Sequence, residues 1–267
     1  MIRGSYFFNT SASQYLSLSG DPAFAIATTT TPFTVEAWIR LRTSGGRILS
    51  EGYPGSGSVS LVFGLCDGTS VQNQGLFLGF GYYTGTTWVS AACSTTELSL
   101  HTWTHVACVF TGSTSRVYIN GLDRTKTSSP TPAATWPITG VNGDIWYIGR
   151  RWDTSAGGTY IDGFIHDLRF VNGSAVYTAN FTPSTGSLSS IANTVVLTCS
   201  NYENESIDRG PNNFTITNVN GVTGSSLLPT QSNFVGEATI ASEEFNAAQA
   251  EKNRSGMWST VEISPKY

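Results

Sequence analysis

The 267-residue chain has little charge and no long apolar run. Only 12% of its residues are charged, about half the usual share, and its net charge of −4 comes from 14 basic and 18 acidic residues. No basic stripe stands out, so the sequence argues against nucleic-acid binding by phosphate neutralisation. No run of about 18 apolar residues occurs, so we expect no membrane span.

The four cysteines are too scattered for the common metal and redox motifs. No CxxC pair occurs, and no combination of Cys and His has the spacing of a zinc site. Cys93, Cys108 and Cys199 lie within apolar runs. We therefore expect buried free thiols in strands.

What the chain has instead is glycine, neutral polar residues and aromatic residues. It contains 28 Gly, 7 Trp, 11 Tyr and 14 Phe, and hydrophobic residues make up 39%. So many aromatic side chains need burial, which excludes a disordered chain. This composition is typical of a β-rich protein with many turns and a neutral polar surface.

Alternation of apolar and polar residues predicts strands along most of the chain. In residues 33–41, for example, five apolar side chains alternate with Thr34, Glu36, Trp38 and Arg40. The predicted strands are residues 15–20, 33–41, 59–65, 75–83, 87–93, 102–110, 115–124, 145–151, 163–171, 194–199 and 212–222.

These strands are regularly spaced, and no amphipathic helix appears before residue 238. Residues 75–93 and 102–124 each predict a hairpin, because a short polar turn separates two strands. We therefore expect an all-β fold of two large antiparallel sheets packed as a sandwich, spanning residues 1–232.

The composition changes after Pro229, and residues 233–267 are predicted to be an extension rather than a domain. Within it, residues 241–254 have the pattern of a short helix, with Ser242 as N-cap, acidic residues in the first turn and basic residues in the last. Its apolar face is thin, so we expect it to dock on the sandwich or on another subunit.

Five segments together resemble a known family. The pairs "QYLSLSG…FTVEAWIRL" and "HTWTHVACVFTGSTSRVYINGLDR", followed by "IWYIGRR…YIDGFIHDLRF" and the closing "VVLTC…NNFTITNVNGVT", are similar to laminin-G-like, concanavalin-A-type jelly rolls. The fifth segment, "LRFVNGSAVYTANFTPST", resembles a version common in virion proteins of tailed phages and marine viruses. The resemblance covers about residues 5–223.

That resemblance implies a virion structural protein, such as a capsid decoration protein, a vertex fibre or a tail-fibre component. Its location would be the virion, assembled in the host cytoplasm. Residues 233–267 would contact other capsid or tail proteins, and virion spikes are often trimeric. The alternative is an adhesin that binds a host surface glycan through rim loops of the same sandwich.

Family members that hold calcium usually carry an early Asp, where this chain has Asn9. Asp162 and Asp167 remain near a later strand and are the candidate ligands of a structural calcium ion. The sequence implies no other cofactor.

No catalytic constellation is apparent. His105 lies in a strand pattern, and His166 and Asp167 are neighbours, which on a regular strand point to opposite faces. Sandwich glycosidases need two carboxylates in one cleft, and no such cluster of acids occurs. We therefore expect the protein not to be an enzyme.

Two loops are candidates for glycan binding, because they combine aromatic faces with hydrogen-bonding groups. The alternative is that these side chains cover the sandwich edge or meet a neighbouring subunit. The candidate residues are Arg151, Trp152, Asp153 and Tyr160 in one loop, and Tyr82, Tyr83 and Trp88 in the other.

The segment 172–185, called the strap here, is predicted to hold the fold together. Val176, Tyr177 and Phe181 would fill apolar gaps along a sheet edge before Pro183 ends the strap. Such a cover would protect an exposed strand edge.

Overall fold

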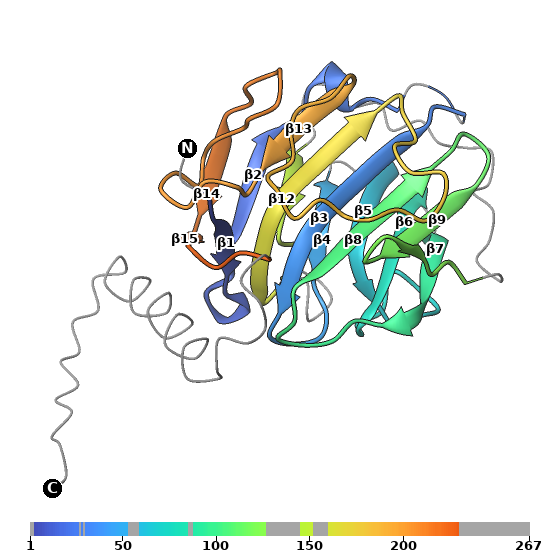
Figure 1. Ribbon diagram of the computed structural model, residues 1–267, viewed down its shortest axis with the longest axis horizontal. Coiled ribbons are helices and arrows are strands. Elements are labelled where there is room, and N and C mark those ends of the chain that lie inside the picture. The colour runs from blue at the N-terminus through green and yellow to red at the C-terminus, as the bar shows by residue number, and fades with distance from the viewer. Residues whose placement is uncertain are drawn as a thin grey trace, which may run out of the picture.

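A computed structural model describes residues 3–26, 28, 30–52, 59–84, 88–126, 145–151 and 160–229. Two antiparallel sheets pack face to face, and the predicted two-sheet sandwich is confirmed (Figure 1). No helix long and apolar enough to cross a membrane occurs in this described part. The predicted extension, residues 233–267, and its helix at 241–254 lie outside the described residues.

Sheet A has eight strands in the order β10-β9-β8-β3-β12-β1-β15, with β13 also paired to β12. Its strands are β1 (Ser5–Phe8), β3 (Phe33–Leu41), β8 (Thr104–Phe110), β9 (Ser115–Ile119), β10 (Leu122–Asp123), β12 (Gly163–Asn172), β13 (Thr194–Thr198) and β15 (Thr223–Ser225).

Sheet B has seven strands in the order β14-β2-β11-β4-β5-β6-β7. They are β2 (Tyr15–Ser19), β4 (Arg47–Gly52), β5 (Val59–Cys66), β6 (Phe77–Thr84), β7 (Trp88–Glu97), β11 (Ile145–Ile148) and β14 (Ile216–Val219). Two short 3-10 helices, η1 (Thr10–Ala12) and η2 (Pro22–Phe24), lie between the first strands.

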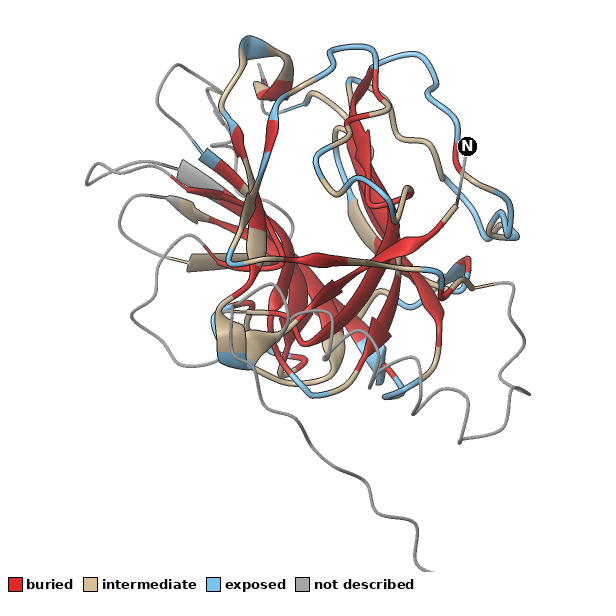
Figure 2. Cartoon of the chain, turned by 90° about the vertical axis from the view of Figure 1, so that its left-hand side faces the viewer, coloured by how far each residue is buried: buried red, intermediate tan, exposed pale blue. Residues whose placement is uncertain are grey.

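The core lies between the sheets, whose strands consist largely of buried residues (Figure 2). Most strands contribute their inward-facing residues to it. The turn η2 adds Phe24, whose ring stacks 4.6 Å from Trp146 of sheet B and 5.9 Å from Phe170 of sheet A. Phe214 stacks on it as well, at 5.0 Å. A residue outside the strands thus joins both layers.

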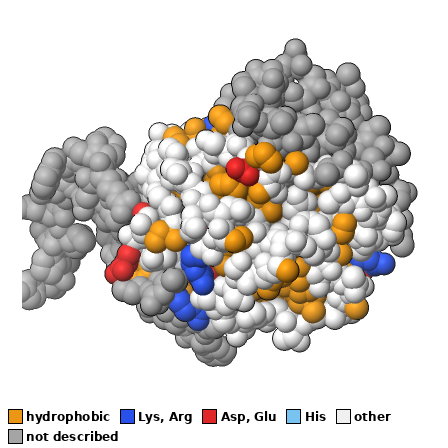
Figure 3. Space-filling view, turned by 90° about the horizontal axis from the view of Figure 1, so that it is seen from above, with side chains coloured by type: hydrophobic (Ala, Val, Ile, Leu, Met, Phe, Trp, Pro, Cys, Tyr) orange, Lys and Arg blue, Asp and Glu red, His pale blue; other side chains and the backbone are white. Residues whose placement is uncertain are grey.

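On the face shown in Figure 3, charged side chains are few, in keeping with the composition.

All eleven predicted strand segments contain strands of the structure, but three strands were missed. β1 and β15 are short edge-side strands of sheet A. β4 escaped notice because Arg47 and Glu51 break its apolar pattern, yet both are buried. The Arg47 guanidinium donates to the carbonyl oxygens of Leu65 and Val71. These hydrogen bonds make burial of the charged side chain tolerable, and they cannot be predicted from the sequence pattern.

The expectation that His166 and Asp167 face opposite sides is wrong. The register of β12 shifts between His166 and Arg169, and Asp167 has φ of +50°. This β-bulge places two consecutive side chains on the outer face of sheet A. His166 Nε2 consequently lies 3.3 Å from Asp167 Oδ2.

The strap is a packing segment that lies mainly over a sheet face, and at Asn180 it also bonds to the edge strand β10. It crosses the outer face of sheet A over β3, β8 and β9 (Figure 1). The rings of Tyr177 and Phe181 stack at 3.5 Å and pack on Ala107, Val109 and Tyr118. The Val176 amide donates to Thr34, and a Cβ at Gly121 would meet Pro183, so the whole strap lies close to the sheet.

Replacing Phe24 by Ala is expected to lower the free energy of unfolding by about 4 kcal/mol, because it leaves a cavity between both sheets. Phe24→Leu, which keeps most of the volume, should cost about 1.5 kcal/mol or less. Denaturant unfolding measures both. Equal stabilities of Phe24→Ala and the natural chain would show that Phe24 does not join the layers.

Candidate functional site

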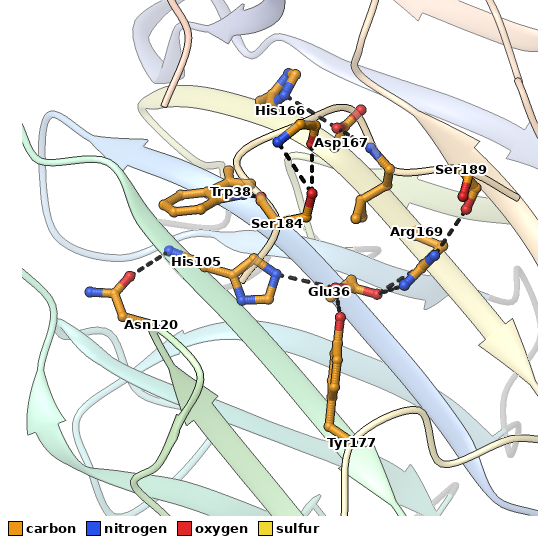
Figure 4. Close-up of polar contacts among 12 residues, drawn as sticks. Glu36, Trp38, His105, Asn120, His166, Asp167, Arg169, Tyr177, Ser184 and Ser189 are labelled. Carbon is orange, nitrogen blue, oxygen red and sulfur yellow. Dashed lines mark hydrogen bonds and ion pairs between the residues drawn. The ribbon is translucent and has the colours of Figure 1, made fainter. Parts of the chain in front are cut away.

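Two buried carboxylates on the outer face of sheet A are the first features to test for chemistry. Glu36 on β3 accepts from Tyr177 Oη at 2.7 Å and from Arg169 Nε at 2.9 Å, and its Oε2 lies 3.1 Å from His105 Nε2 (Figure 4). Glu36 is fully buried. Its partners come from β8, β12 and the strap.

Asp167 repeats this arrangement one strand further along the sheet. Besides His166, its Oδ2 accepts the Leu188 amide at 2.7 Å, and its Oδ1 lies 3.6 Å from Arg209. His166 Nδ1 donates to the Gly4 carbonyl oxygen at 2.7 Å. Each buried carboxylate is therefore matched by a histidine, an arginine and a donor from the segment that covers the sheet.

These groups are buried and bonded to one another and to the covering segments. Burial alone would raise the pKa of Glu36, but the hydrogen bond from His105 and the charge of Arg169 outweigh it and hold that pKa below its ordinary value. Burial, with Glu36 beside it, raises the pKa of the Tyr177 hydroxyl. Glu36 is thus an ionised carboxylate whose oxygens accept hydrogen bonds from neighbouring side chains, and it has the features of a structural group rather than of a general base.

Asp162 and Asp167 do not converge on one calcium ion. Asp162 immediately precedes β12, whereas Asp167 lies within β12 at its bulge. Asp162 lies 3.5 Å from the Arg42 guanidinium, whereas Asp167 is held as described above. No group of three or more His, Cys, Asp or Glu side chains that could hold a metal occurs among the described residues.

The outer face of sheet B carries a different set of side chains, called the aromatic–arginine face here. On β2 and β11 the core takes Leu16, Trp146 and Ile148, so alternation turns Tyr15 and Tyr147 outward. The members of the face are Tyr15, Tyr83, Trp88, Tyr147, Arg150, Arg151 and Tyr160.

Arg150 is the centre of one half of this face. Its guanidinium carbon lies 4.6 Å from the ring centroid of Tyr15, 4.7 Å from that of Tyr147 and 5.5 Å from that of Tyr160. Such cation–π contacts fix the rings relative to one another. Burial raises the pKa of the Tyr147 hydroxyl, although the charge of Arg150 opposes this. Ser50 donates to the Arg150 carbonyl oxygen at 2.8 Å, which holds the backbone there.

Arg151 connects this half to the other. Its guanidinium carbon lies 5.5 Å from the ring centroid of Trp88, and Trp88 lies 5.2 Å from Tyr83, its cross-strand partner. The two candidate loops, which the sequence suggested separately, are thereby brought together on one face. All five aromatic rings of the face are half-buried, so part of each meets solvent.

One predicted member is misplaced, and three members of the face, Tyr15, Tyr147 and Arg150, were missed by the sequence reasoning. Tyr82 is fully buried in the core, because it is one residue away from Tyr83 and pairs with the inward Leu61. Tyr15 and Tyr147 were recognisable only as outward positions of alternating strands. Trp152 and Asp153 lie outside the described residues.

Comparison with known proteins agrees with this architecture. A family model described as the concanavalin A-like lectin/glucanases superfamily matches residues 10–185, well over half of the chain. The chain belongs to this superfamily. No curated protein matches it.

The solved structures of similar fold have low sequence identity to the chain. A Bacteroides ovatus protein, provisionally named a carbohydrate binding protein, is 18% identical with a TM-score of 0.52, over 85% of this chain and 60% of that one. A heptameric SAP-like pentraxin from Limulus polyphemus is 17% identical with a TM-score of 0.49, over 84% and 95%. At such identities the first of these supports the fold alone.

Glu36→Gln is expected to lower the free energy of unfolding by about 3 kcal/mol at pH 7, because Arg169 loses its buried counter-charge. The folded-state pKa of Glu36 is depressed, so its contribution is present above the unfolded value of 4.5 and is lost as pH falls through the folded value. The gap between the two proteins should therefore narrow below pH 4.5. Urea unfolding at several pH values measures it, and a gap that stays constant down to acid pH would contradict an ionised Glu36.

Proposed function

We propose that the protein is a non-catalytic carbohydrate-binding sandwich that holds its ligand on the aromatic–arginine face. One observation carries this proposal: Tyr83 and Trp88 from one hairpin and Arg150, Arg151 and Tyr160 from another segment meet on the same side of sheet B.

Sugars present apolar C–H surfaces and hydroxyl edges. Flat aromatic rings stack on the former, while guanidinium and phenol groups hydrogen-bond the latter. The face runs from Tyr15 on β2 to Trp88 on β7, five strand spacings apart. At about 4.8 Å per spacing this is roughly 24 Å, which suits an oligosaccharide better than a single sugar.

The superfamily and the burial of Glu36 and Asp167 both favour binding over catalysis. The superfamily's name covers lectins as well as glucanases, and the Bacteroides ovatus protein of similar fold is named for carbohydrate binding. In the described part of the chain, the carboxylates that stand beside histidines, Glu36 and Asp167, are buried and bonded under covering segments on sheet A, away from this face.

Trp88→Ala is expected to weaken glycan binding about tenfold, or about 1.4 kcal/mol, because a stacking surface is lost. A glycan array identifies the ligand and calorimetry measures the affinity. Trp38→Ala is the matched control, because Trp38 is also half-buried but lies on sheet A under the strap. Absence of any glycan hit, or equal loss in both variants, would refute the site.

The setting of this binding is the second part of the proposal. The segment 168–183, whose resemblance to phage virion proteins is set out above, favours a structural component of a virion, with the sandwich exposed and residues 233–267 anchoring it to capsid or tail. Binding of a host surface glycan and attachment to a particle are compatible, since they use different parts of the chain.

Deletion of residues 233–267 is expected to abolish incorporation into particles while leaving the melting temperature and the glycan affinity of the sandwich unchanged. Quantitative blotting of purified virions measures the incorporation. Full occupancy after the deletion would contradict an anchoring role for the extension.

A further inference from the structure

Two cysteine side chains converge on the outer side of sheet B, and neither belongs to the aromatic–arginine face. Cys66 ends β5 and Cys93 lies on β7, yet their sulfur atoms are only 3.6 Å apart and both side chains are buried. Leu65 and Leu78 point into the core, so alternation turns Cys66 and Gly79 outward. Cys93 pairs directly with Gly79 and therefore shares its side of the sheet.

Gly79 of β6 provides the space in which the two sulfurs meet. It lies opposite Cys93, whereas Cys66 lies opposite Phe77, two residues further along β6. A Cβ at Gly79 would meet the Cys66 sulfur at 2.7 Å and Val71 Cγ1 at 3.3 Å. The missing side chain thus lets both thiols lean across β6, beneath Val71 of the loop that follows β5.

Strand order argues against a direct disulfide between these thiols. β5 and β7 pair with opposite sides of β6, so the two backbones are two strand spacings apart. At about 4.8 Å per spacing this is roughly 9.6 Å, whereas a disulfide joins Cα atoms at most about 7 Å apart. Both residues are thiols in the structure, which agrees with this geometry.

A metal ion between the sulfurs fits the same geometry better. Two metal–sulfur bonds of about 2.3 Å in line hold the sulfurs roughly 4.6 Å apart, whereas a disulfide needs about 2.05 Å. From the present 3.6 Å, the first requires a small widening by side-chain rotation. The second requires two separated strands to move together. The span therefore favours a bridging ion.

The number and kind of ligands favour a soft monovalent ion. Thiolates select Cu(I) and zinc among the common metals, and structural zinc takes four ligands. In the part of the chain that the structure describes, no group of three or more His, Cys, Asp or Glu side chains could hold a metal. Cu(I) is satisfied by two thiolates in a nearly linear arrangement, so this pair is sufficient for it.

Arg47 supplies the charge that such a complex needs. Two thiolates and one Cu(I) carry a net charge of −1, which a buried site tolerates only beside a cation. The Arg47 guanidinium is buried and donates to the carbonyl oxygen of Val71, the residue above the thiols. The hydrogen bond with Cys93 lowers the pKa of Cys66 against the effect of burial, and the Gly68 amide and the charge of Arg47 lower it further.

We propose that Cys66 and Cys93 form a two-coordinate site for Cu(I), with Gly79 below the ion and Val71 above it. Each thiol releases one proton as its sulfur binds the ion, so binding weakens as pH falls. The ion would join the end of β5 to β7. It would also stabilise the folded chain by mass action, because the unfolded chain holds no preformed site. This site is independent of the proposed glycan binding.

Anaerobic titration of the reduced full chain with Cu(I), against a chromogenic Cu(I) chelator, tests the proposal. The natural chain should bind a single ion. Cys66→Ala and Cys93→Ala should each weaken binding at least about 100-fold, the upper end of the cost of losing an outer-shell partner. Cys108→Ala is the matched control and should bind normally, because Cys108 is also fully buried but lies on β8 in the core.

Thermal melts without metal verify that the variants fold, and added Cu(I) should raise the melting temperature of the natural chain alone among the natural chain and the two site variants. X-ray absorption of the copper-loaded natural chain, which needs no variant, should show two sulfur ligands. A natural chain that binds no Cu(I), or an equal loss in Cys108→Ala, would overturn the proposal. So would a chain with two titratable thiols in place of four after exposure to air without metal, because the pair would then close directly to a disulfide.

Discussion

Glu36 carries its negative charge at the outer surface of sheet A, yet none of its side chain reaches solvent. A buried carboxylate is tolerable only with matched partners, and here these are His105, Arg169 and Tyr177, from β8, β12 and the strap. The charge therefore ties three segments, distant in sequence, to β3. The adjacent Asp167 does the same for the segment after the strap.

This covering gives the two sheets different tasks. The outer face of sheet A carries aromatic rings too, but Tyr177 and Phe181 lie over it and its polar groups bond to covering segments (Figure 4). On sheet B, the rings around Arg150 and Arg151 are half-buried and partly meet solvent. One face is thereby committed to stability, and the other is the face on which we propose that a ligand binds.

Alternation predicted most strands, because one buried face per strand leaves a period of two in the sequence. It failed at β4, where the charged residues Arg47 and Glu51 are buried. It also failed at Tyr82, because neighbouring positions of a strand face opposite sides, so Tyr82 lies in the core whereas Tyr83 faces outward. Of the candidate site, both loops were predictable from their aromatic and arginine content. Their meeting, and the part of Tyr15 and Tyr147 in it, depended on strand order.

The sequence by itself determined the all-β class, the position of most strands and the superfamily, since these follow from local pattern and motif. Only the tertiary structure decided that the strap covers a face, that His166 and Asp167 share a side, and that Arg151 reaches Trp88. Each of these depends on a bulge, a register or a pairing between segments far apart in the chain. Such contacts leave no periodic trace in the sequence, because they are set by where whole strands lie.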